Sequence, residues 1–163
     1  MMNIEVLQAQ WTLRRIRAED VHVITTQLLD ASPTSKSLAR LAGMIGAPYW
    51  EIAPILESVF AEAHLAPVDE NTARWRLAYE TARQITAEEV TPLDGATSLS
   101  YLASELGLPD PLRHFVYLAA DYGEGPEDRS TEETWFDTQI RETANELLAL
   151  RPSLGEFPIP HDD

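Results

Sequence analysis

Apolar residues recur at helical spacing along most of this chain, and no segment shows the period-two alternation of a half-buried strand. The segment 50–64 is typical, because it has a stripe of apolar side chains at positions 52, 55, 56, 59, 60 and 63. This pattern predicts an all-α fold. We expect eight helices, at about residues 4–16, 19–30, 36–45, 50–64, 70–87, 96–106, 111–122 and 131–150.

Several helix ends have a predicted physical cause. Asp110 precedes Pro111, which predicts a side-chain acceptor at the N-cap and a fixed φ at the first helical position. Ser130 and Glu133 have the spacing of a capping box. Pro54 interrupts a periodic run, so it must either lie in the first turn of its helix or kink that helix.

Two stretches of the sequence resemble each other. SLARLAGMIGAP at 37–48 aligns without gaps on SLSYLASELGLP at 98–109, with six of twelve positions identical. A Trp-x-Leu triplet precedes each copy, beginning at Trp11 and at Trp75. Both copies predict a helix with an apolar i, i+3, i+4, i+7 stripe that includes Ile45 in the first copy, ended by a left-handed glycine, Gly46 or Gly107.

The repeat suggests how the domain is organised. A chain of 163 residues is close to the usual size of one domain, so we expect a single all-α domain over 1–152 and a flexible tail over 153–163. Within it we expect two related three-helix units, at about 9–64 and 73–122, and a closing helix at about 131–150. The alternative is a chance match between two amphipathic helices that both end in Gly-x-Pro. If the duplication is real, function should lie where the copies differ.

The charge of the chain limits the classes of partner that it is expected to bind. Twelve basic residues stand against 27 acidic ones, and the formal net charge is −15. This excess disfavours nucleic-acid phosphates and anionic membrane surfaces and favours a basic protein partner. No oligomeric state follows from it. Because the chain has no cysteine, no basic leader and no long apolar run, we expect a cytoplasmic protein without disulfides.

No catalytic motif is present in the sequence. The four histidines are scattered, no phosphate-binding glycine loop occurs, and the loop from Asp121 to Glu132 has glycines where an EF-hand needs ligands. We therefore predict no catalytic residue, no metal site and no cofactor. A small helical enzyme or a carboxylate-dependent metal-binding module stays open as an alternative, as does an assembly subunit.

The segment DYGEGPEDRSTEETWFD at 121–137 is the strongest candidate for a binding surface. It has seven carboxylates, one arginine and the adjacent pair Trp135 and Phe136. A tryptophan surrounded by acids is typical of an interaction hot spot for a cationic partner. A solvated connector, with Trp135 covering the end of the core, is the alternative. The predicted partner-binding residues are Asp121, Glu124, Glu127, Asp128, Glu132, Glu133, Trp135 and Asp137.

A further pattern spans about a fifth of the chain and consists of Ala78, Ala82, Ile85, Val90-Thr91-Pro92, Gly95-Ala96 and Leu99. It resembles small acidic helical proteins of bacteria, including immunity proteins encoded beside toxins. The resemblance implies stoichiometric inhibition of a toxin, with no catalytic residues. Together with the charge, it leads us to expect a non-catalytic acidic binding protein that neutralises a basic toxin or a similar cationic protein.

Overall fold

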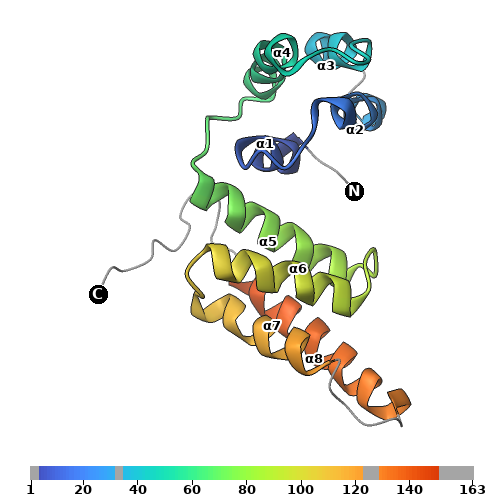
Figure 1. Ribbon diagram of the computed structural model, residues 1–163, viewed down its shortest axis with the longest axis vertical. Helices are drawn as coiled ribbons and strands as arrows, with labels where there is room; N and C mark the ends of the chain where they lie inside the picture. The colour runs from blue at the N-terminus through green and yellow to red at the C-terminus, as the bar shows by residue number, and fades with distance from the viewer. Residues whose placement is uncertain (1–3, 32–34, 123–128, 151–163) are drawn as a thin grey trace. The chain divides into compact units, whose positions relative to one another are not determined.

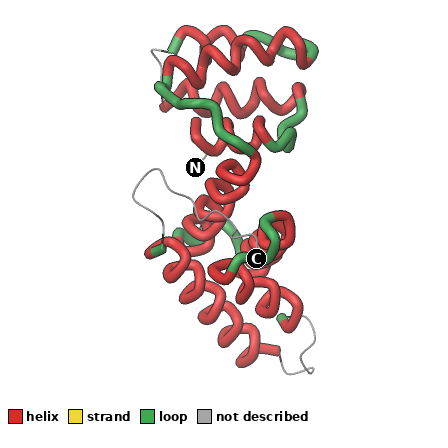
Figure 2. Tube along the Cα trace, turned by 90° about the vertical axis from the view of Figure 1, so that its left-hand side faces the viewer, coloured by secondary structure: helices red, strands yellow, loops and turns green. Residues whose placement is uncertain are grey.

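The computed structural model describes residues 4–31, 35–122 and 129–150, and these residues form eight helices and no strand (Figures 1 and 2). The predicted all-α fold is therefore confirmed. The helices are α1 (Ile4–Thr12), α2 (Ala18–Ala31), α3 (Lys36–Ala42), α4 (Tyr49–Glu62), α5 (Glu70–Thr86), α6 (Pro92–Glu105), α7 (Asp110–Asp121) and α8 (Arg129–Ala149).

The chain divides into two compact units, residues 1–73 and 74–163. The second unit begins one residue after the predicted start of the second repeat, at 73. The single domain expected over 1–152 and the duplication both stay predictions. The tail expected at 153–163 lies outside the described residues.

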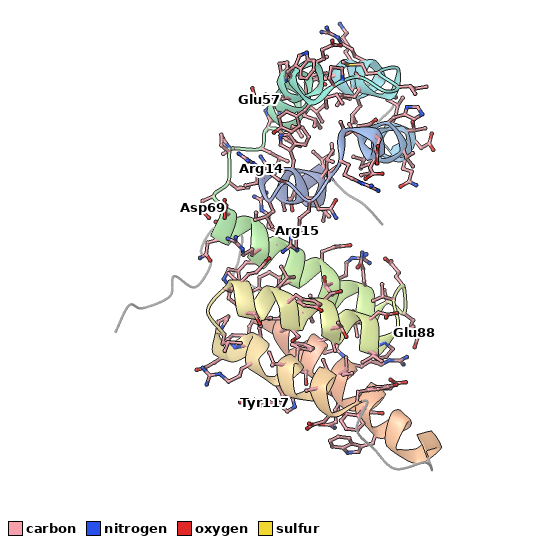
Figure 3. The ribbon with its side chains drawn as sticks, in the orientation of Figure 1. Arg14, Arg15, Glu57, Asp69, Glu88 and Tyr117 are labelled. Carbon is pink, nitrogen blue, oxygen red and sulfur yellow. The ribbon has the colours of Figure 1, made fainter. Side chains whose placement is uncertain are left out.

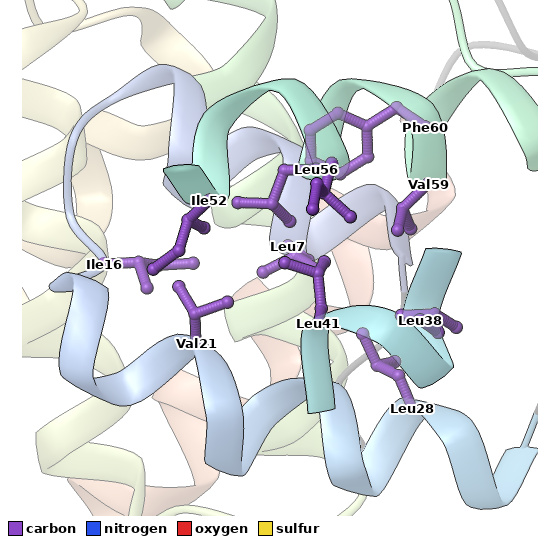
Figure 4. Packing of buried hydrophobic residues seen from close by; sticks show 11 residues of the cluster. Leu7, Ile16, Val21, Leu28, Leu38, Leu41, Ile52, Leu56, Val59 and Phe60 are labelled. Carbon is purple, nitrogen blue, oxygen red and sulfur yellow. The ribbon is translucent and has the colours of Figure 1, made fainter. Parts of the chain in front are cut away.

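The first unit buries the apolar faces of α1 to α4 in one cluster (Figure 4). Two buried polar side chains in this unit are satisfied. The Thr25 hydroxyl donates to the carbonyl oxygen of Val21 over 2.8 Å, and Gln8 Nε2 donates to the carbonyl oxygen of Ala66 over 2.9 Å. The cluster is made of Leu7, Ile16, Val21, Leu28, Leu38, Leu41, Ile52, Ile55, Leu56, Val59 and Phe60.

The second unit packs α6, α7 and α8 against one another. Its largest fully buried side chains are Trp75 and Phe115, and α8 adds Ile140 and Leu147. Gly95 on α6 lets this helix approach the end of α5, because a Cβ atom built at Gly95 would lie 2.3 Å from Cγ1 of Ile85. A glycine is therefore needed at this contact.

The predicted left-handed conformation of the two glycines is confirmed, but the predicted end of the helix before Gly46 is not. Gly46 and Gly107 both have positive φ, 71° and 78°. However, α3 ends at Ala42 with Gly43 as its C-cap, earlier than predicted. The helical stripe stops there, and the prediction that Ile45 belongs to it was wrong, since Ile45 is 75% exposed.

Two helix starts differ from the prediction. Asp110 lies inside α7, whose N-cap is Pro109, and its carboxylate contacts Arg113 Nη1 at 3.1 Å instead of capping the helix. α6 begins at Pro92 rather than near 96, because the Thr91 hydroxyl accepts the backbone N–H of Asp94 over 3.1 Å. The capping box expected at Ser130 and Glu133 falls on side chains outside the described set.

Pro54 lies in the second turn of α4, and the helix continues past it to Glu62. A proline has no N–H to donate to the carbonyl oxygen four residues earlier, which here belongs to Trp50. Both Pro54 and Trp50 are exposed, so water can bond that oxygen. Water can therefore replace the missing hydrogen bond, whereas the steric contact of the proline ring with that carbonyl group remains.

Candidate functional site

An aromatic cluster joins the end of α7 to the first half of α8. Tyr122 is the C-cap of α7 and packs against Phe136, with ring centroids 5.4 Å apart. Phe136 in turn meets the edge of the Trp135 ring, at a centroid distance of 4.9 Å and an interplanar angle of 81°. Phe136 is half-buried, whereas Trp135 is 55% exposed. Trp135 thus lies on the flank of the helix, and its ring contacts Phe136.

Asp137 has a structural partner in this cluster. The hydroxyl of Tyr122 donates a hydrogen bond to Asp137 Oδ1 over 2.9 Å, which ties α7 to α8. The sequence predicts Asp137 as one of several acids that bind a partner. The structure gives it a contact within the protein, so a substitution there also loosens the connection between the two helices.

The structure describes the other predicted site residues to different extents. Asp121 is exposed and is the last residue of α7, next to Tyr122. Glu132 and Glu133 belong to the first turns of α8, but their side chains are outside the described set. Glu124, Glu127 and Asp128 lie outside the described residues altogether.

α8 adds two exposed acids to the surface around Trp135, and neither was among the predicted site residues. Glu142 and Glu146 are exposed and lie seven and eleven positions after Trp135, which places the three residues on one helix face. Gln139 lies between them and donates from Nε2 to Glu142 Oε2 over 2.9 Å. The three side chains span about 16 Å along the helix axis. The i, i+7, i+11 spacing was available in the sequence as the signal for this face.

The charges on this face favour a cationic side chain. Arg141, the basic residue of α8 whose side chain is described, is on the flank and contacts Glu88 Oε1 at 2.8 Å through Nη1. Its charge is therefore matched within the protein. An arginine or lysine of a partner could lie over the Trp135 ring as a cation–π pair and contact the carboxylates of the following turns.

The described residues contain no group of three histidine, aspartate or glutamate side chains that could hold a metal ion. The absence of a metal and of a cofactor stays a prediction. Among the described helices, none is both long and apolar enough to cross a membrane.

The residues behind the resemblance to immunity proteins are mostly core residues. Ala78, Ala82, Ile85, Ala96 and Leu99 are all fully buried, on α5 and α6. Such positions report how two helices pack rather than which partner is bound, because function depends on exposed chemistry. The resemblance therefore stays a prediction. No protein-family model matches the chain, and no curated protein or solved structure matches it either.

Proposed function

We propose that this chain is a non-catalytic, acidic binding protein that neutralises a basic protein partner, as an immunity protein or inhibitor neutralises a cationic toxin. The observation that supports this best is the half-exposed Trp135 at the head of a helix face with Glu142 and Glu146. Within this face, the described side chains include two acids and no base.

The support of the Trp135 ring favours a role in binding. Phe136 contacts the Trp135 ring in an edge-to-face arrangement, and Tyr122 packs against Phe136 in turn, so the Trp135 ring loses little conformational freedom when a partner covers it. Tryptophan is also enriched among the residues that contribute most to protein interfaces.

The charge favours a basic partner over the other classes of macromolecule. Residues 121–163 include 12 acids and 3 bases. A field of this sign repels nucleic acid and anionic membranes, and it accelerates the encounter with a cationic protein. We accordingly propose neither a nucleic acid nor a membrane as the partner.

The test measures the affinity of the full chain for a nona-arginine peptide by calorimetry at low salt. Trp135→Ala should weaken the affinity about 2- to 5-fold, which corresponds to the free energy of an exposed cation–π contact. Trp50→Ala is the matched control, because Trp50 is a second exposed tryptophan, on α4 of the first unit. It should leave the affinity for this peptide unchanged.

Circular dichroism should show that both variants keep their helix content. An unchanged affinity in folded Trp135→Ala, or an equal loss in both variants, would count against the α8 face as the binding site.

A further inference from the structure

A second exposed apolar surface lies in the first unit, at the corner between α3 and α4. Ile45 is 75% exposed, Trp50 is 74% exposed, and Tyr49 is half-exposed. These three large side chains fall within six residues of the chain. Large apolar groups gathered in this way mark interaction sites more often than single exposed residues do.

The backbone and a ring stack hold this corner in place. Gly46 takes the left-handed conformation in the turn, and Pro48 is the N-cap of α4. The Tyr49 ring stacks on Trp11 of α1 with centroids 4.6 Å apart and an interplanar angle of 10°. The exposed side chains therefore start from a fixed backbone, which lowers the entropy lost on binding.

Comparison with the aligned segment 98–109 shows that the exposure at position 45 is not repeated at the matching position. Ile45 aligns with Leu106, which is only 8% exposed and packs into the second unit. The same apolar position is thus part of the core in one segment and exposed to solvent in the other. Helix packing alone does not require an exposed isoleucine at position 45.

The surface continues along the outer face of α4. Trp50, Pro54, Glu57 and Ala61 are exposed at i, i+4, i+7 and i+11, and Figure 3 labels Glu57 on this helix. Pro54 and Ala61 are small enough to let a second helix approach between the tryptophan and the end of α4. The face is opposite the buried stripe, so no helix of the first unit covers it.

The charges of α4 decide which occupant fits. Its charged residues are Glu51, Glu57 and Glu62, with no base among them. Glu62 accepts hydrogen bonds from the hydroxyls of Ser35 and Ser37, over 2.7 and 2.5 Å, which leaves Glu51 and Glu57 to face a partner. A second copy of α4 would place carboxylates against carboxylates.

We propose that the α3–α4 corner and the outer face of α4 bind an amphipathic helix of another protein, one whose apolar stripe covers Ile45 and Trp50 and whose flanking lysines or arginines meet Glu51 and Glu57. This surface is separate from the α8 face and does not depend on the function proposed for it.

The test uses a 14-residue helical peptide of leucine and lysine and its leucine–glutamate analogue with the same apolar stripe. The leucine–lysine peptide should bind the full chain saturably, and its amide NMR perturbations should centre on residues 45–57. Trp50→Ala should weaken this binding roughly 10-fold or more, as truncation of a hot-spot residue does. Ile45→Ser should also weaken it, and the exposure of both residues means that neither substitution disturbs the core.

Tyr101→Ala is the matched control, because Tyr101 is an exposed aromatic residue on α6, outside both proposed surfaces, and it should bind the leucine–lysine peptide as the parent does. The proposal is overturned if Trp50→Ala binds unchanged, if the leucine–glutamate peptide binds equally well, or if the perturbations centre on α8. It is also overturned if sedimentation of the protein alone shows a dimer that Trp50→Ala dissociates, because the face would then belong to a second copy. Failure of the α8 proposal would leave each of these outcomes unaffected.

Discussion

At the scale of single residues, the best-defined electrostatic contact is an arginine held between two glutamates at the end of α5. Arg83 Nη2 contacts Glu80 Oε1 at 2.8 Å and Glu89 Oε2 at 2.7 Å, and Nη1 donates to Glu89 Oε1 over 2.9 Å. Both carboxylates are therefore bonded by one guanidinium group. This arrangement fixes the turn after α5 relative to the helix that precedes it.

This contact predicts an unusually acidic glutamate. The pKa of Glu89 is lowered from 4.5 to about 2, and the largest cause is its hydrogen bonds from Arg83. Because the folded-state pKa is depressed, the contribution to stability is complete above about pH 4.5 and is lost as the pH falls through about 2. Carboxyl NMR titration should give a pKa near 2 for Glu89 in the parent protein.

Arg83→Gln should return the pKa of Glu89 toward its ordinary value, since the main cause of the shift is gone. Arg113→Gln is the control, because Arg113 pairs with Asp110 and is placed elsewhere, on α7. If Glu89 titrates at the same pH with and without Arg83, the bridge does not exist in solution.

At the scale of helices, the contact between α5 and α6 depends on one glycine. A methyl group at position 95 would lie 2.3 Å from Cγ1 and 2.6 Å from Cδ1 of Ile85, which is fully buried. Gly95→Ala should therefore lower the free energy of unfolding by about 1–3 kcal/mol, the usual cost of overpacking a core. Urea denaturation measures this change.

Gly43→Ala is the matched control, because a Cβ atom there would come no closer than 3.5 Å to a neighbouring atom and the residue has a φ of −83°. Its effect should be small. Gly95→Ala should cost less in an Ile85→Ala background, where the clashing atoms are gone. Equal costs in both backgrounds would contradict the predicted clash.

The helices themselves could be predicted from the sequence, whereas several of their ends could not. The 3.6-residue period is set by packing against a core, and it located all eight helices. Ile45 was misplaced because Gly43 ends α3 before the periodic pattern does. Asp110 was misplaced because several local partners compete for one carboxylate, and Arg113, three residues later, forms the contact instead.

The candidate sites were predictable to different degrees. The exposure of Trp135 followed from the apolar stripe of its helix, which places Phe136 inward and Trp135 on the flank. The hydrogen bond from Tyr122 to Asp137 did not, since it depends on how α7 and α8 meet. The exposed corner at Ile45 and Trp50 was also missed, because an apolar residue at helical spacing is normally assigned to the core.

At the scale of the whole molecule, the negative charge is unevenly divided. Residues 1–73 include 9 acids and 5 bases, whereas residues 74–163 include 18 acids and 7 bases. At 0.1 M ionic strength, exposed charges farther apart than about 10 Å are largely screened from each other. The acids near a binding face should therefore matter more to association than the net charge of −15 does.

This screening predicts how salt should affect the association of a nona-arginine peptide. Replacing Asp121, Glu142 and Glu146 with their amides should slow association and flatten its dependence on salt, because these acids are exposed on or near the α8 face. Asp137 is left intact to preserve its bond with Tyr122. The control replaces three exposed acids of the first unit that lie outside the α3–α4 surface, Glu19, Asp30 and Glu70, with amides, so the change in net charge is the same. Stopped-flow rates from 0.02 to about 0.2 M salt should fall more steeply for the control than for the α8 variant. Equal slopes would mean that the summed charge of the protein, rather than the acids beside Trp135, attracts the peptide.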